Sequence, residues 1–176
     1  RMLLPRKALD EVRKLCEGDV GAWEIAFGER SATFQTQGLT LMVRLVDGEF
    51  PDYRQVLPEA YKRRLVLNRK VFQDALKRVA IVASDRNHSV RFSFEEQQLV
   101  LEAQNVDLGN AKEEVEAELE GDSFDTGFNI SYFMDIMRNT SGDELILEMG
   151  EPLDPCIVRI PGRDDCLFVV MPIRLD

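Results

Sequence analysis

Three stretches of the chain place apolar residues at helical spacing behind a residue that favours a helix start. They span residues 4–14, 67–78 and 128–138, and their start residues are Pro5, Asn68 and Asn129. Leu9, Phe72 and Phe133 occupy the same place in the three stretches. An acidic residue follows each start residue by six positions, at Glu11, Asp74 and Asp135. The chain therefore repeats one helical unit.

Alternating apolar and polar positions predict antiparallel strands between these helices. The expected strands are residues 23–27, 32–36, 40–45, 90–94, 99–103, 145–149, 156–160 and 167–171. Turn residues at Asp47-Gly48 and at 161–163 predict hairpins. Each unit is expected to contain a strand, one helix and then several antiparallel strands, so the predicted fold class is α+β.

The acidic stretch 112–120 also alternates, with Val115, Ala117 and Leu119 expected to face inward and the glutamates between them to face water. A solvated strand face is the simpler interpretation. An edge strand that faces a protein partner is the alternative.

Composition narrows the possible functions. The net charge is −10, which argues against bulk affinity for nucleic acid, although local clusters of Lys and Arg still count. No apolar run is long enough to cross a membrane and no signal peptide is visible. Cys16, Cys156 and Cys166 lack metal-ligand spacing, and their odd number favours a reducing cytoplasm. His88 is the only histidine and is expected in a solvated loop, so no metal or cofactor is expected.

The predicted helices are basic on one face. Residues seven apart share a face two turns along, and the pairs are Arg6 and Arg13, Lys7 and Lys14, Lys70 and Lys77, and Ser131 and Arg138. A solvated face is again the simpler interpretation. The contrast between basic helices and acidic strands favours a surface that meets DNA phosphates.

Several longer motifs resemble one family. They are LLPRK at 3–7, LVDGEFPDYRQVLP at 45–58, GFNISY at 127–132 and VVMPIRL at 169–175. The chain resembles the bacterial DNA polymerase III beta subunit family, the sliding clamps, along its whole length. The resemblance implies the DNA clamp fold, in which repeated helix-plus-antiparallel-sheet units place helices on the inner face of a ring and sheets outside.

The resemblance also predicts the domains. Residues 1–58 match the second half of the clamp middle domain with its connection, and residues 59–176 match the complete third domain, so a C-terminal fragment is expected. Clamps are non-catalytic processivity factors of DNA polymerase that encircle duplex DNA without reading its sequence. Their partners are the catalytic subunit of DNA polymerase III, the clamp loader and repair polymerases, and the full-length protein forms a homodimer ring.

The resemblance implies three surfaces. The peptide-binding groove that receives short linear motifs would use Pro51, Val56, Val169, Met171, Pro172, Ile173, Arg174 and Leu175. Arg6 and Lys7 match DNA-facing family positions, and helical spacing adds Lys70, Lys77 and Arg138. Ile81 and Val82 occupy the place of the ring interface, with the strand 114–119 as a neighbouring edge. The alternative for the groove residues is that they only complete the core, as Phe50, Leu57 and Val170 are also placed to do.

Some features depart from the family pattern. Gln55 stands where members often carry a basic residue, and Asp176 adds a carboxylate after Leu175. The loop 151–155 is expected to border the groove. Without a first domain the normal ring cannot close, so a monomer or an association through exposed edges is expected.

Two other classes of function were weighed. An enzyme with paired carboxylates at Asp143 and Glu144 or Asp164 and Asp165 lacks an accompanying base, metal cluster or phosphate loop. A truncated module that binds clamp partners without encircling DNA remains open.

Overall fold

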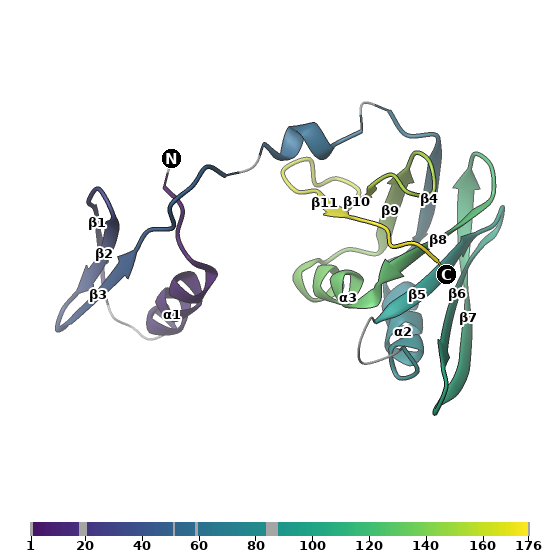
Figure 1. Cartoon of the computed structure of the whole chain (residues 1–176), viewed down its shortest axis with the longest axis horizontal. Coiled ribbons are helices and arrows are strands. Elements are labelled where there is room, and N and C mark those ends of the chain that lie inside the picture. Colours follow the sequence, from purple (N-terminus) through teal and green to yellow (C-terminus); the bar gives the residue numbers. More distant parts are fainter. Residues whose placement is uncertain (1, 18–20, 51, 59, 84–87, 176) are drawn as a thin grey trace. The chain divides into compact units, whose positions relative to one another are not determined.

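The computed structural model describes residues 2–17, 21–50, 52–58, 60–83 and 88–175 (Figure 1). The chain divides into two compact units, Arg1–Asp52 and Tyr53–Asp176. Each unit has its own hydrophobic core.

The first unit contains one helix and one small sheet. Its elements are α1 (Arg6–Cys16), β1 (Glu24–Phe27), β2 (Ser31–Thr36) and β3 (Leu39–Arg44), and the antiparallel strand order is β1-β2-β3. Ala32, Phe34 and Val43 are buried, and side chains such as Ala8 and Val12 of α1 pack against them. Amphipathic α1 thus covers one face of the sheet.

The second unit contains two helices and eight strands. After a 3-10 helix, η1 (Tyr53–Val56), come β4 (Arg63–Asn68), α2 (Arg69–Ala80), β5 (Ser89–Phe94), β6 (Gln98–Asn105), β7 (Gly109–Glu120) and β8 (Phe124–Asn129). These are followed by α3 (Ile130–Asn139), β9 (Glu144–Met149), β10 (Cys156–Arg159) and β11 (Phe168–Val170). The antiparallel strand order is β11-β10-β9-β4-β7-β6-β5-β8.

The two helices of this unit pack against each other over an aromatic core. Phe72 of α2 and Phe133 of α3 meet edge to face with ring centroids 5.9 Å apart, and Phe92 and Phe128 of the sheet complete the cluster. Asn68 and Asn129 each accept backbone hydrogen bonds at the helix starts, which satisfies amide groups that have no partner within the helix.

The predicted helices are confirmed, and Pro5, Asn68 and Asn129 are their N-cap residues. Phe72 and Phe133 are fully buried, whereas Leu9, the third member of that register, is 49% exposed. The reason is that α2 and α3 bury each other's apolar stripes, whereas the first unit as described has a single helix.

The predicted strands are also present, with three differences. The pattern gave no bounds for β4 and β8, which run directly into α2 and α3. Among residues 2–5 no strand precedes α1, although the Leu3 carbonyl accepts a hydrogen bond from the Val46 amide. The hairpin prediction at Asp47-Gly48 was wrong, because this dipeptide follows β3 in the connection and the β2–β3 turn lies at Gln37-Gly38. The turn at 161–163 does join the paired strands β10 and β11.

The acidic strand β7 faces water as predicted. Val115 and Ala117 are buried, and Glu114, Glu116 and Glu118 are exposed. The edge-strand alternative holds for only part of it: residues 117–120 pair with β4 on one side, and residues 109–116 pair with β6 on the other. The end of β7 therefore lies inside the sheet, whereas its first part, residues 109–116, has no β4 partner and forms an open edge.

Candidate functional site

The C-terminal segment carries most of the predicted groove residues and has a fixed backbone. Its strand β11 pairs with β10, with Val169 opposite Ile157. Beyond the strand, the Ile173 amide donates a hydrogen bond to the Gly127 carbonyl of β8 at 2.8 Å. Because β11 and β8 are the two ends of the strand order, this bridge joins the two edges of the sheet.

Gly127 makes the bridge possible. A Cβ atom at this position would lie 2.9 Å from the Ile173 carbonyl oxygen and 2.8 Å from Leu175 Cδ2, closer than side chains pack. The segment therefore rests directly on the β8 backbone. Val170 is buried, whereas Met171 (55%) and Arg174 are exposed. The half-buried side chains are Val169, Pro172, Ile173 and Leu175. The expectation that Val170 only completes the core agrees with its burial.

The connection of the second unit lies against β10, the strand that pairs with β11. Leu57 and Pro58 line a groove of about 560 Å³ together with Ile157 and Arg159 of β10. Ile157 in turn pairs with Val169. Val56, at the end of η1, is 49% exposed beside this groove. Pro51, the other connection residue predicted for the groove, and Asp176 lie outside the described residues.

The loop between β9 and β10 is held next to the C-terminal segment. Thr126 of β8 donates its hydroxyl hydrogen to the Pro152 carbonyl, one residue before the Gly127 that receives Ile173. The Glu151 amide donates to the Asp154 carboxylate at 2.7 Å. The loop is therefore fixed beside the strand that receives Ile173, and Leu153 is 55% exposed on it. That the loop borders the groove stays a prediction.

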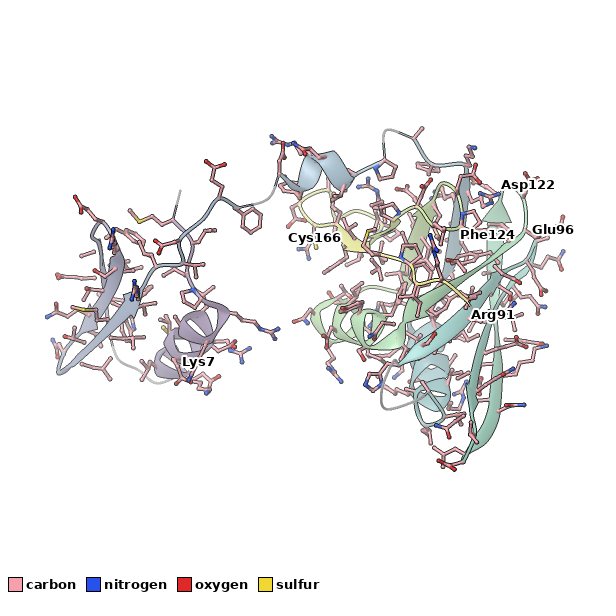
Figure 2. All side chains as sticks on the ribbon, viewed as in Figure 1. Lys7, Arg91, Glu96, Asp122, Phe124 and Cys166 are labelled. Atoms are coloured by element: carbon pink, nitrogen blue, oxygen red, sulfur yellow. The ribbon has the colours of Figure 1, made fainter. Side chains whose placement is uncertain are left out.

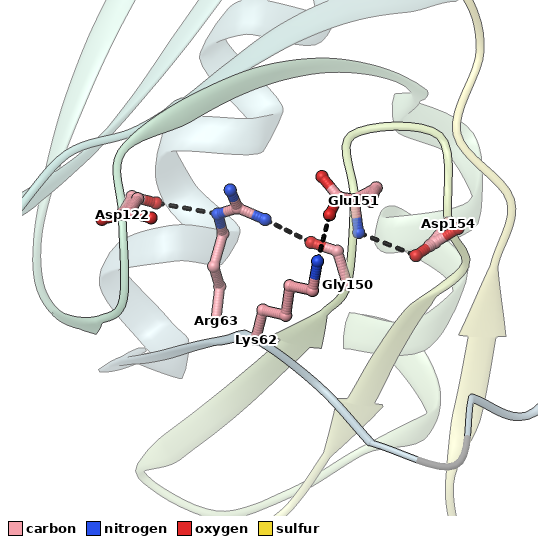
Figure 3. Close-up of polar contacts among 6 residues, drawn as sticks. All are labelled: Lys62, Arg63, Asp122, Gly150, Glu151 and Asp154. Carbon is pink, nitrogen blue, oxygen red and sulfur yellow. Dashed lines mark hydrogen bonds and ion pairs between the residues drawn. The ribbon is translucent and has the colours of Figure 1, made fainter.

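Arg63 ties three segments together below this loop (Figure 3). Its Nε donates to the Asp122 carbonyl at 2.9 Å, its Nη1 donates to the Gly150 carbonyl, and its guanidinium lies 4.5 Å from the centre of the Phe124 ring. The preceding Lys62 pairs with Glu151, and the hydrogen bond from this ammonium lowers the pKa of the Glu151 carboxyl. The start of β4, the β7–β8 turn and the β9–β10 loop therefore form one polar cluster.

The predicted DNA-facing cations lie on exposed helix faces. Arg6 and Lys7 belong to α1 (Lys7 is labelled in Figure 2), Lys70 and Lys77 to α2, and Arg138 to α3. All five side chains are exposed. On α2 and α3 they stand opposite the apolar residues that enter the core. The arrangement provides cations without base-specific geometry, which suits contact with a phosphate backbone.

Ile81 and Val82 differ in their availability. Ile81 caps the end of α2 and is 73% exposed, whereas Val82 is half-buried against the core. Arg78, one turn earlier, donates two hydrogen bonds of 2.7 Å to Glu113 of β7. This bidentate pair fixes the end of α2 beside the stretch of β7 that has no β4 partner.

The carboxylate pairs weighed for an enzyme do not form a catalytic site in the described part of the chain. Asp165 forms an ion pair with Arg163, and Asp143 and Glu144 are exposed. No group of metal-ligating side chains occurs among the described residues. Among the same residues, no helix is both long and apolar enough to cross a membrane.

Comparisons with known proteins decide the family. Residues 54–174 match the profile of the C-terminal domain of the DNA polymerase III beta subunit, and residues 1–52 match that of its central domain. The chain belongs to the DNA polymerase III beta subunit family. This is a family of sliding clamps, non-catalytic processivity factors of DNA replication, and the predicted family and clamp fold are confirmed.

Curated relatives include the beta sliding clamp of Pseudomonas putida, 31% identical over 99% of this chain and 48% of its own length. The Caulobacter vibrioides clamp is 29% identical over 99% of this chain and 47% of its own. The chain thus spans about half the length of the curated relatives it matches.

Solved structures agree. The clamp of Thermotoga maritima superposes with a TM-score of 0.86 at 31% identity, covering 99% of this chain and 48% of its own. The Bartonella birtlesii clamp, solved bound to griselimycin, gives a TM-score of 0.89 at 32% identity. The match covers 99% of this chain and 47% of the Bartonella chain.

Two exposed apolar side chains of the second unit were not predicted as site residues. Tyr132 is 56% exposed on α3, a helix that contacts β11, and Leu153 projects from the loop described above. No sequence pattern shows that these two apolar side chains face water, because their exposure depends on where the loop and the helix lie in the fold.

Proposed function

We propose that this chain contributes to a DNA polymerase processivity factor by binding the short linear motifs of replication and repair proteins. The observation that carries this proposal is the C-terminal segment, fixed to β8 by Ile173 and Gly127 while Met171 stays exposed. A rigid backbone with one deformable, exposed thioether suits a site that receives varied apolar side chains.

Within the second unit, the proposed groove uses Val56 as one lip and residues 169–175 as the other. Leu153, exposed on the loop that Thr126 holds beside β8, extends the apolar surface around the second lip. Lys62 and Arg63 hold the loop that carries Leu153 in place, because they bind Glu151 and the Gly150 carbonyl at its start. Burial of one large apolar side chain contributes roughly 1.5–3 kcal/mol, so two anchors give binding in the micromolar range after ordering costs.

The decisive experiment is calorimetric titration of the chain with a clamp-binding peptide that ends in bulky apolar residues. Met171→Ala and Val56→Ala should each weaken binding about tenfold, the effect of one lost anchor. Met42→Ala is the matched control, because Met42 is an exposed methionine on β3 of the other unit. Binding that survives both groove substitutions would refute the groove.

The helices supply the second part of the proposal, a sequence-independent contact with duplex DNA through Arg6, Lys7, Lys70, Lys77 and Arg138. Their exposure and their lack of base-reading geometry support it. Binding to a short linear duplex should be weak and strongly salt-dependent, and the triple variant K70Q/K77Q/R138Q should weaken it further. Tight binding to one particular sequence is the outcome that contradicts a sliding surface.

In a ring, residues 1–58 would form the second half of a middle domain with its connection, and residues 59–176 a third domain. Ile81 and Val82, with the part of β7 that has no β4 partner, would then meet another protomer. Replication of the bacterial chromosome places this function in the cytoplasm. The alternative is a module that binds clamp partners without encircling DNA. Peptide binding without any salt-dependent DNA binding would support this alternative.

A further inference from the structure

One acid–cation pair recurs at the same place in α1, α2 and α3. In each helix the acid lies six residues after the N-cap residue and its partner lies three residues further. The nitrogen–oxygen distances are 2.9 Å for Lys14–Glu11, 3.0 Å for Lys77–Asp74 and 2.7 Å for Arg138–Asp135. The pairing is thus part of the repeated unit and not a feature of one helix.

Further acid contacts lie on the same faces. Asp74 stands between two lysines, at 3.0 Å from Lys77 and 3.8 Å from Lys70. In α1, Arg6 lies 3.9 Å from Asp10. Four of the five cations proposed to face DNA therefore have a carboxylate partner on their own helix. Lys14, the partner of Glu11, shares a face of α1 with the fifth cation, Lys7.

A carboxylate tethered one turn away competes directly with a phosphate for the same cation. The tether keeps the competitor at a high effective concentration. Each exposed pair is weak by itself, so it does not prevent contact between the cation and a phosphate. Each pair nevertheless lowers the free energy that this contact gains, and its carboxylate repels the phosphate. Hydrogen bonds from Lys14 and Lys77 lower the pKa of the Glu11 and Asp74 carboxyls, so the pairing favours the charged form that competes with phosphate.

We propose that Glu11, Asp74 and Asp135 attenuate the attraction of the helix faces for duplex phosphates. This inference rests on the proposed DNA-facing role of the helices and explains how that contact stays weak. Three attenuated contacts are easily exchanged from one phosphate to the next, which a surface that moves along DNA requires. The cations supply the attraction and the acids limit it.

The test measures binding of the full chain to a short fluorescent duplex of mixed sequence by anisotropy across a salt series. The variant E11Q/D74N/D135N should bind about tenfold more tightly at low salt, since each lost pair contributes about twofold. The plot of log binding constant against log salt concentration should steepen by at most about 0.9 for each Lys or Arg that loses its carboxylate partner. All three positions lie on solvent-facing helix surfaces, so the fold should be retained, and circular dichroism checks this.

A matched control separates local attenuation from net charge. The variant E116Q/E118Q/E144Q removes the same number of acids from exposed positions on the sheet, and it should change affinity much less. Equal gains from both triple variants would overturn the attenuation proposal. The single substitution Asp74→Asn provides a milder change with the same expected direction.

Failure of the proposed DNA face would look different. If K70Q/K77Q/R138Q weakens binding but the helix-acid variant gains no more than the control, the DNA face stands and the attenuation proposal falls. If no variant, including the helix-acid variant, binds the duplex at low salt, both fall. A gain confined to the helix-acid variant supports both.

Discussion

The amide of Ile173 is bonded to the carbonyl of Gly127 at 2.8 Å, and this one contact joins the last residues of the chain to the far edge of the sheet. A side chain at Gly127 would meet Ile173 and Leu175 at less than 3.0 Å. The position of the proposed groove wall thus depends on the absence of a Cβ atom.

Gly127→Ala should release the C-terminal segment from β8. The added methyl group meets backbone, which cannot yield cheaply, so we expect a stability loss of about 1–3 kcal/mol and peptide binding weakened at least about tenfold. Chemical denaturation and calorimetry measure the two effects. Val115→Ala creates a cavity at a fully buried side chain of β7, far from the segment in sequence, and should lower stability yet leave peptide affinity unchanged. Normal peptide binding by the Gly127 variant would contradict this role.

Arg63→Met should destabilise the second unit by roughly 2–3 kcal/mol, because it leaves the Asp122 and Gly150 carbonyls without this donor and removes the cation from the Phe124 ring. Urea denaturation measures the change. Arg64→Met is the matched control, because Arg64 makes a single 3.3 Å contact with the exposed Glu120 and should cost less than about 0.5 kcal/mol. Similar losses in the two variants would show that the cluster is not a structural tie.

The three cysteines should react with a thiol reagent at very different rates. Cys16 is exposed, Cys166 in the β10–β11 loop is half-buried (Figure 2), and Cys156 is fully buried. Burial raises the pKa of the Cys156 thiol far above its usual value, with a smaller contribution from Glu148. Mass spectrometry of alkylated protein should therefore find Cys16 modified first and Cys156 only after unfolding. Early labelling of Cys156 would contradict the described core.

Acid should weaken the contact between the end of α2 and β7. The hydrogen bonds from Arg78 lower the pKa of Glu113 below its ordinary value of 4.5. A carboxyl with a lowered folded-state pKa stabilises the fold fully above its unfolded pKa, and this contribution is lost as the pH falls through the lower, folded value. Melting temperatures measured from neutral pH to below 4.5 should fall less steeply for Arg78→Gln than for the unchanged chain. Glu116→Gln on the exposed face of β7 provides the control, and an unaltered slope in the Arg78 variant would exclude the pair as a source of acid sensitivity.

Periodicity alone was enough to find the three helices and most strands, because Phe72 and Phe133 mark one register and the N-cap residues mark where each helix begins. It did not bound β4 and β8, since a strand that runs directly into a helix has no turn residue between them. Asp47-Gly48 misled because the dipeptide favours hairpins only when two strands flank it.

The candidate site was less accessible to sequence reasoning. The motif at 169–175 indicated the segment, but its attachment to Gly127 depends on contact between residues far apart in the chain. The same holds for Arg63, whose partners Asp122 and Gly150 no local pattern connects to it. Tyr132 and Leu153 were missed because exposure of an apolar residue becomes visible only once the fold is known.

The place of β4 in the sheet has a consequence for biosynthesis. This strand is the first of its unit to leave the ribosome, yet it lies between β7 and β9. Its backbone groups can find their final partners on both sides only after residue 149 has been synthesised, and the sheet edges join only when Ile173 follows. The unit should therefore acquire its structure late and all at once after translation, with the pace set by contacts between distant parts of the chain.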